Sequence, residues 1–207
     1  MFKTILHYQI PLAIITVVLC IITYNQITLT KALNEPFFSV SIDAVRDNSG
    51  FYSTKYLRIE NSGGEARGIH VDKKQYYVVT YTEDLKSHGP FYIPAIFYFA
   101  SYKPNLSKGL VYESFTPNNN LTLYNFNMSL RNLDRFYIVE AVVFTSISYT
   151  TIFGDKKTLY FYNEELLNAL PPEVAGKSQI MAIDIDKLSL ELMEKYIEEK
   201  NYITIGN

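Results

Sequence analysis

The feature that most constrains this chain is an uncharged apolar run near its N-terminus, which decides the solvent in which the rest must fold. Residues Ile10 to Tyr24 read IPLAIITVVLCIITY, and the stretch from Ile5 to Tyr24 contains no Asp, Glu, Lys or Arg. That length matches the roughly 20 residues with which a helix crosses a bilayer core of about 30 Å. We therefore expect a transmembrane anchor within residues 1–24, whose anchoring side chains include Ile10, Leu12, Ile14, Val17, Leu19 and Ile22.

Two other interpretations of the run are weaker than an uncleaved anchor. A cleaved signal peptide needs a shorter apolar core and small residues before the cleavage site, and the best candidate, Thr30-Lys31-Ala32, lies well past the run. A lipoprotein signal would use Cys20, but Leu19 stands where that signal needs a small side chain. Lys3 before the run gives a small charge bias toward a cytoplasmic N-terminus, so we expect the large domain outside the cytoplasm.

The remaining composition favours a single β-rich domain after a short polar stem over residues 25–36. The 207 residues include 18 Tyr and 13 Phe beside only 9 Gly, which suits the pleated surfaces of strands. A net charge of -2 with interspersed signs disfavours nucleic acid as a partner. Cys20 is the only cysteine, so no intramolecular disulfide can form and packing alone must hold the fold.

Alternation of apolar and polar residues predicts strands throughout residues 37–162. Phe38, Val40, Ile42 and Ala44 alternate with polar residues before a turn at Asp47-Asn48-Ser49-Gly50. In 136–148 both alternating sets are apolar, which is typical of a central strand, and Pro94 places the strand around it at an edge or a bulge. The expected further strands are 56–60, 66–71, 75–82, 91–102, 121–126, and a closing hairpin of 147–153 and 157–162. Seven or eight such strands predict an antiparallel β-sandwich.

One stretch of this region resembles a known family. Leu57-x-Ile59-x-Asn61-x-Gly63-x-x-Ala66-x-x-Ile69-x-Val71 resembles the early strands of bacterial immunoglobulin-like sandwiches of the cell-adhesion-related type. The resemblance implies that Asn61 and Gly63 make a turn and that the small Ala66 permits close packing where the chain passes between sheets. It also implies an immunoglobulin-like sandwich in a bacterial cell-envelope protein.

The alternation stops after Tyr162, and residues 163–207 read as a helical appendage. Asn163 can cap a short helix through Leu170, which Pro171-Pro172 would end. A second, amphipathic helix is expected from Asp186 or Ser189 to Lys200.

No pattern of catalytic or metal-binding residues is visible. The histidines are His7, His70 and His88, there is no Gly-x-Ser-x-Gly elbow, and the single thiol lies in the apolar run. Asp184 with Asp186, or His70 with Asp72, could share a metal ion, but a helix cap and a solvent-facing strand explain these pairs better. We therefore assign no catalytic residue, no metal and no cofactor, and expect the protein not to be an enzyme.

The aromatic stretch FYIPAIFYFASY, residues 91–102, allows two interpretations. Its rings could be core residues plus an amphipathic Tyr face, which is the commoner arrangement. Alternatively they form an exposed contact strip for a protein, a glycan or the membrane surface, made of Phe91, Tyr92, Phe97, Tyr98, Phe99 and Tyr102.

Together these features predict a single-pass membrane protein whose extracytoplasmic sandwich is a non-catalytic binding or assembly module. The alternative of another class is an accessory subunit or enzyme of the cell envelope that uses an unrecognised carboxylate site. A cleaved, secreted domain is the third interpretation.

Overall fold

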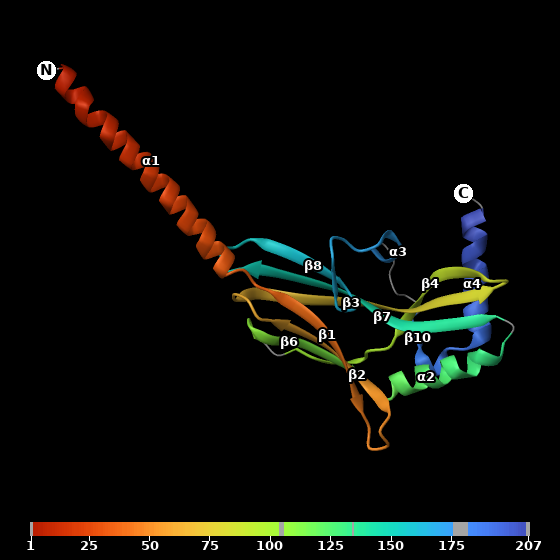
Figure 1. Ribbon diagram of the computed structural model, residues 1–207. Helices are drawn as coiled ribbons and strands as arrows, with labels where there is room; N and C mark the ends of the chain where they lie inside the picture. The colour runs from red at the N-terminus through yellow and green to blue at the C-terminus, as the bar shows by residue number, and fades with distance from the viewer. Residues whose placement is uncertain (1, 104–105, 134, 176–181, 206–207) are drawn as a thin grey trace.

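The protein consists of a long N-terminal helix joined to a mainly β domain (Figure 1). The computed structural model describes residues 2–103, 106–133, 135–175 and 182–205. The helices are α1 (Phe2–Leu33), α2 (Asn119–Ser129), α3 (Pro172–Ala175) and α4 (Leu190–Ile205), with short 3-10 helices η1 (Leu130–Asn132) and η2 (Ile185–Lys187). The strands are β1 (Phe38–Arg46), β2 (Tyr52–Asn61), β3 (Ala66–Glu83), β4 (Lys86–Ile96), β5 (Ala100–Tyr102), β6 (Gly109–Thr116), β7 (Phe136–Thr151), β8 (Lys156–Tyr162), β9 (Glu165–Leu167) and β10 (Ile183–Asp184).

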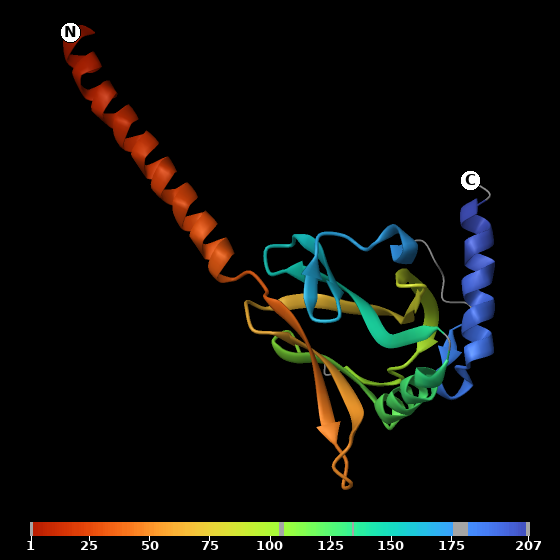
Figure 2. The same cartoon turned by 45° about the vertical axis from the view of Figure 1, so that its right-hand side comes forward.

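The strands form two sheets that share one hydrophobic core. The four-stranded sheet has the order β1-β2-β6-β5, and the six-stranded sheet has the order β10-β4-β3-β7-β8-β9. The described ladders are antiparallel, except that β10 runs parallel to β4. Figures 1 and 2 show the two sheets as layers, with α1 leaving from one end of the domain and α4 lying at the other.

The expected alternation produces the core. In β1, Phe38 and Val40 are buried while Ser39 between them is exposed. Leu57 and Ile59 of the four-stranded sheet meet Tyr77, Val79, Ile93, Val143 and Ile147 of the six-stranded sheet in one buried cluster. The Asp47 carboxylate accepts hydrogen bonds from the backbone N–H groups of Ser49 (2.8 Å) and Phe51 (3.0 Å), which confirms the predicted turn between β1 and β2.

The prediction of a central strand is confirmed for β7, which lies between β3 and β8. Its Val143 and Ile147 enter the core between the sheets, whereas Val142 and Phe144 enter a second buried cluster on the opposite face. The expected strands 136–148 and 147–153 are one strand here, and the expected strands 66–71 and 75–82 are likewise joined in β3. The closing hairpin with β8 is confirmed.

The predicted strand over residues 121–126 is wrong, because this segment belongs to helix α2. Leu123, Phe126 and Leu130 lie three and four residues apart, so a helix turns all three toward the core. The Asn127 side chain then bonds both backbone groups of Val139 in β7, accepting from N–H at 2.9 Å and donating to C=O at 2.8 Å. Tertiary contacts therefore override the local alternation.

The predicted helix from Asn163 to Leu170 is also wrong. Asn163 has a positive φ of 51° and turns the chain between β8 and the short strand β9. Its side-chain oxygen accepts a hydrogen bond from the N–H of Val143 at 3.0 Å, so the residue serves a turn rather than a helix cap. Pro172 begins α3 instead of following a helix, while the second predicted helix is confirmed as α4, where the Ser189 hydroxyl accepts from the N–H of Leu192 at 3.2 Å.

Candidate functional site

Helix α1 is longer than the expected anchor, and its apolar side chains have no covering protein along the described part. The stretch Ala13–Leu33 is long and apolar enough to cross a membrane. Ile14, Val17, Leu19 and Ile22 are all exposed, as is Cys20; Ile10 and Leu12 belong to the same helix, but their side chains lie outside the described residues. The helix also takes up most of the expected stem, since only residues 34–36 separate Leu33 from the sandwich at Phe37.

The end of α1 is fixed to the sandwich by one buried asparagine. Asn61 is fully buried, and its side-chain oxygen accepts from the N–H groups of Phe37 (3.0 Å) and Gly63 (3.2 Å). Its amide nitrogen donates to the C=O groups of Gly64 and Ser107, each at 2.7 Å. Asn61 therefore joins the stem, the turn between β2 and β3, and the loop before β6.

The two glycines of that turn permit the stem to lie against it. A Cβ on Gly63 would clash with the Glu35 carbonyl oxygen, and a Cβ on Gly64 would clash with the Asn34 carbonyl oxygen. The N–H of Gly64 instead donates to the Glu35 carbonyl at 2.9 Å. Asn61 thus ends β2 and Gly63 lies in the turn that follows, with Ala66 buried at the start of β3.

Glu35 ties the stem to the six-stranded sheet as well. Its carboxylate lies 2.7 Å from the Lys157 ammonium on β8 and accepts a 3.3 Å hydrogen bond from the Tyr149 hydroxyl on β7. Partial burial and the adjacent Glu35 charge raise the pKa of Tyr149 to about 12. The stem is therefore held by both sheets.

The predicted contact strip is not one surface. Phe97 and Tyr98 are buried in the core, and Phe91 and Tyr92 are half-buried, Phe91 against the core and Tyr92 against the second cluster. Only Phe99 and Tyr102, at 52% and 60% exposed, face solvent. The continuous exposed strip is a wrong expectation, because the chain passes from β4 to β5 between residues 96 and 100 and so carries its rings from one sheet to the other.

Tyr102 does belong to a different aromatic surface, on the outer face of the four-stranded sheet. Phe115 of β6 pairs with Tyr56 of β2 on one side and with Ala100 of β5 on the other. Tyr102 is two residues after Ala100 on β5 and therefore points to the same face of the sheet. The Phe115 and Tyr56 rings stack with centroids 5.7 Å apart. Both rings are half-buried and neither belongs to a buried cluster of the described residues. We call Tyr56, Tyr102 and Phe115 the open aromatic face.

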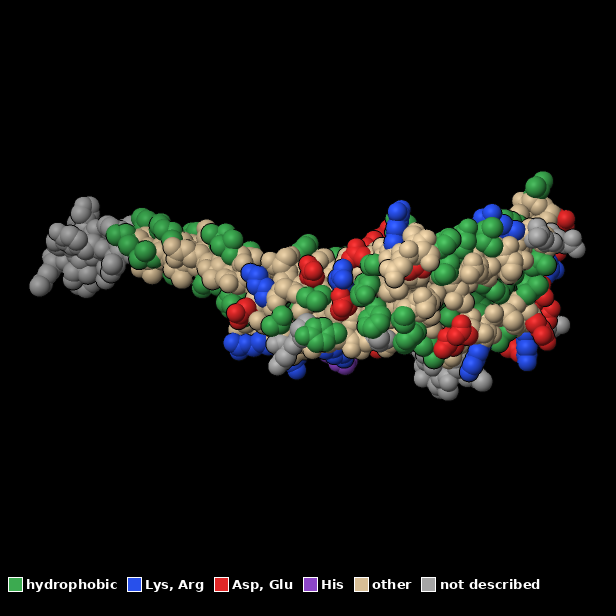
Figure 3. All heavy atoms as spheres, turned by 90° about the horizontal axis from the view of Figure 1, so that it is seen from below, with side chains coloured by type: hydrophobic (Ala, Val, Ile, Leu, Met, Phe, Trp, Pro, Cys, Tyr) green, Lys and Arg blue, Asp and Glu red, His purple; other side chains and the backbone are tan. Residues whose placement is uncertain are grey.

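A charged network lies across the same face. Arg58 is 2.7 Å from the Glu113 carboxylate and 3.0 Å from that of Asp43, and its guanidinium lies 4.9 Å from the centre of the Tyr56 ring. The hydrogen bond and charge of Glu113, with those of Asp43, raise the pKa of Arg58 further, so it stays cationic. Figure 3, which views the domain from below Figure 1, shows hydrophobic side chains at the surface among acidic and basic ones.

Part of this face could be predicted from the sequence. Because Leu57 and Ile59 point inward in a predicted strand, Tyr56 and Arg58 must point outward. Phe115 lay outside every predicted strand, and its pairing with Tyr56 depends on the register of β6.

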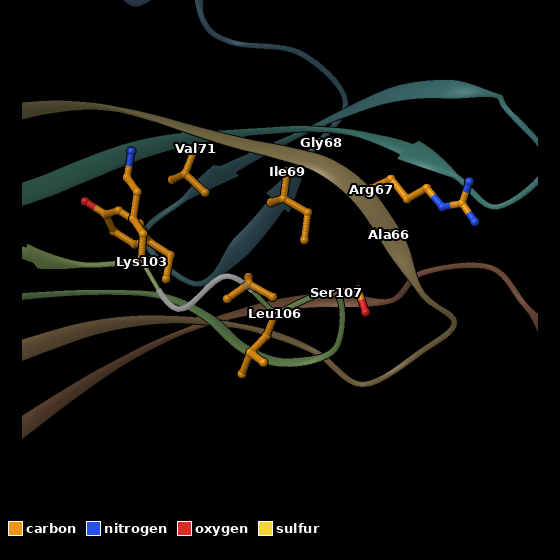
Figure 4. A pocket seen from close by; sticks show the side chains of 10 residues that line it. Ala66, Arg67, Gly68, Ile69, Val71, Lys103, Leu106 and Ser107 are labelled. Carbon is orange, nitrogen blue, oxygen red and sulfur yellow. The ribbon is translucent and has the colours of Figure 1, made fainter.

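A cleft of about 550 Å³ opens between β3 and the loop before β6 (Figure 4). Its lining is apolar apart from Arg67, Lys103, Ser107 and Tyr112, with no carboxylate among the described lining residues. Beside it, the Lys73 ammonium donates to the Ser114 hydroxyl (2.6 Å) and the Tyr98 carbonyl (2.8 Å), and burial together with the Lys103 charge lowers its pKa to about 8. Lys73 thus links the two sheets.

Neither candidate metal pair has a third ligand among the residues that the structure describes. His70 and Asp72 are exposed on β3 while Ile69 and Val71 pack against the core, as the alternation predicted. Asp184 lies in the two-residue strand β10, and Asp186 lies in η2. Among the described residues, no three His, Cys, Asp or Glu side chains are grouped to hold a metal ion.

Comparison with known proteins gives no relative for this arrangement. No protein-family model, no curated protein and no solved structure matches the chain.

Proposed function

We propose that this protein is a single-pass membrane protein that presents an extracytoplasmic, immunoglobulin-like sandwich as a non-catalytic binding module. The observation that carries the proposal is the open aromatic face on a domain whose stem is fixed to an exposed apolar helix. A fixed stem gives the domain one orientation relative to the membrane, and a module that must meet a partner at a surface needs that property.

The strand order supports the immunoglobulin-like assignment. Constant-type immunoglobulin domains pair strands A-B-E-D in one sheet and C-F-G in the other, and variable types add C′ beside C. Assigning A to G in chain order gives β1-β2-β6-β5 for A-B-E-D and β4-β3-β7-β8 for C′-C-F-G. Strands β9 and β10 are additions at the two edges of the six-stranded sheet.

Two properties of α1 support the membrane assignment. The first acidic residue of the whole chain is Glu35, which comes only after α1 has ended. The helix spans 32 residues, about 48 Å at 1.5 Å per residue, which exceeds a hydrocarbon core of about 30 Å and leaves its last turns in the headgroup layer.

The open aromatic face supports contact with a protein partner. Tyr and Arg are the residue types that contribute most to binding energy at protein interfaces, because they combine large rigid surfaces with hydrogen bonding. Here Arg58 is already oriented by two carboxylates and by the Tyr56 ring, so it would lose little further conformational entropy on binding.

Fractionation and protease access test the membrane assignment. After a carbonate wash the intact chain should stay in the membrane pellet, and protease added to cells stripped of any outer barrier should degrade the region after Phe37. Release of a shortened chain that begins near Leu33 would contradict the anchor. Full protection with the inner membrane unbroken would reverse the orientation.

Site-specific photocrosslinking tests the binding role. A benzophenone side chain at Tyr102 should give one discrete adduct in native membranes, and the combined substitutions Y56S and F115S should abolish it. The matched control is the same crosslinker at Leu166, which is exposed on β9 of the other sheet. The same adducts from both positions, or none from Tyr102, would refute a contact surface on the open aromatic face.

A further inference from the structure

The turn between β7 and β8 presents large apolar side chains where hairpin turns are usually polar. Ile152 and Phe153 are both exposed. The Gly154 N–H donates to the Thr151 carbonyl at 3.0 Å, and the Asp155 N–H donates to the Thr151 hydroxyl at 3.2 Å. Neither apolar side chain belongs to a buried cluster of the described residues, so the core does not explain their presence.

This turn lies beside the C-terminal end of α1. The Lys31 ammonium is 5.7 Å from the centre of the Phe153 ring, and Lys157 just after the turn is paired with Glu35. In both Figure 1 and Figure 2 the β7–β8 end of the domain is next to the end of α1. The hydrogen bond between Asn61 and the N–H of Phe37 helps to fix the end of α1 relative to the domain that carries this turn.

The side chains gathered here are those found at membrane interfaces. Leu33, Phe37, Ile152 and Phe153 are exposed; Lys31 lies over the Phe153 ring, and the exposed Lys156 and Lys157 follow the turn. The acidic residues of the same region include Glu35, which is paired with Lys157, Asp155 in the turn, and the exposed Glu65, which precedes the Thr151 partner Ala66. Aromatic rings and lysines can occupy the headgroup layer together, because the rings reach toward the acyl chains while the ammonium groups meet lipid phosphates.

The helix geometry puts the turn at the right height. Lys31 lies seven residues after Tyr24, the end of the uncharged run, which is about 10 Å along the helix axis. The headgroup layer on each side of a bilayer is about 5–8 Å thick, so a modest tilt of α1 brings Phe153 into it.

We propose that the turn formed by Ile152, Phe153, Gly154 and Asp155 inserts into the headgroup layer of the leaflet from which α1 emerges. This second lipid contact would fix the tilt of the sandwich on the membrane. The inference rests on the proposed function, since it requires α1 to span that bilayer.

The absence of tryptophan from the sequence allows a direct test. The full chain carrying F153W is placed in vesicles of phosphatidylcholine and phosphatidylglycerol, with or without bromine atoms on the upper acyl carbons. The indole emission should be shifted to the blue and quenched by the brominated lipid. The matched control is F51W, the same substitution at the exposed turn between β1 and β2, which should be neither shifted nor quenched.

A third variant separates failure of this inference from failure of the anchor. I14W places the indole in α1, where lipids brominated deep in the acyl chain should quench it. I152W probes the second apolar residue of the turn in the same way as F153W. Quenching of I14W without quenching of F153W or I152W would contradict insertion of the turn but would still support the anchor. Loss of quenching in I14W would overturn the anchor itself, and equal quenching of F51W and F153W would overturn a contact specific to the β7–β8 turn.

Discussion

The outer faces of the two sheets are both aromatic, yet within the described parts of the chain only one of them is covered. On the six-stranded sheet, Tyr76, Phe144 and Tyr92 pack as neighbouring rings beneath residues 167–174, and Val174 is fully buried there. On the four-stranded sheet, the rings of Tyr56 and Phe115 also pack against each other, stacked rather than edge to face, but they remain half-buried, beside the exposed Tyr102.

The two faces have the same types of residue but differ in whether another segment buries them. Burial of the rings of the six-stranded sheet under α3 stabilises the fold, because each buried aromatic side chain removes a large apolar area from water. Rings left half in solvent gain less and are available to a partner. The same type of residue therefore has a structural role on one face and, in our proposal, a binding role on the other.

The largest expected effect comes from making the same substitution on both faces. F144A should lower the free energy of unfolding by about 3–5 kcal/mol, because it leaves a cavity among packed rings. F115A should cost about 1 kcal/mol, since its ring is half solvated. Chemical denaturation of the full chain in detergent, followed by circular dichroism, measures both. Equal losses would show that the two faces are equally covered.

A single substitution in the cover should turn the covered face into an open one. V174D places a hydrophilic carboxylate among apolar side chains, and we expect it to release α3 at a cost of about 2 kcal/mol. Binding of a hydrophobic dye should rise as the rings of Tyr76 and Phe144 become accessible. Unchanged stability and dye binding would mean that residues 167–174 do not cover this face in solution.

Two adjacent lysines on β3 distinguish the inner from the outer face of the same sheet. Lys73 donates to Ser114 of the opposite sheet, whereas Lys74 donates to the Val174 carbonyl in the cover at 2.9 Å. The pKa of Lys73 is lowered from 10.5 to about 8, so between these values the unfolded chain holds more protons than the folded chain. Stability due to Lys73 should therefore rise as the pH increases from 8 to 10, by about 1 kcal/mol after allowance for partial solvation.

The measurement compares the pH dependence of unfolding in the wild type with that in K73M and K74M. The rise between pH 8 and 10 should be smaller in K73M and retained in K74M. Identical pH profiles of the wild type and K73M would place the Lys73 ammonium in solvent, contrary to the link between the sheets.

The smallest effect on stability is expected from R58M on the open aromatic face. Its ion pairs with Asp43 and Glu113 are partly solvated, so their loss should change the free energy of unfolding by less than about 1 kcal/mol. The yield of the Tyr102 photoadduct should nevertheless fall, because Arg58 would no longer be presented to the partner. A large loss of stability would instead make the network a structural feature, like the rings of the covered face.

Local sequence patterns were sufficient for those elements whose residues need no distant partner. Alternation in β1, the Asp47 turn, the two apolar faces of β7 and the stripe of α4 each encode their structure within a few residues, and the structure confirms them. Residues 121–126 alternate as clearly as β1 does, but their three-residue and four-residue spacing fits the core better as a helix. The local pattern alone could not decide between the two.

By itself, the sequence determined a helix around a long uncharged apolar run and a β-rich domain, because hydropathy and side-chain alternation are properties of neighbouring residues. Only the tertiary structure decided which aromatic residues are exposed. The stretch 91–102 is divided between two sheets, so Phe97 enters the core while Tyr102 joins Phe115 and Tyr56, which are distant in the chain. Exposure depends on strand register and on which segment covers which face, and both are set by contacts between residues far apart in the sequence.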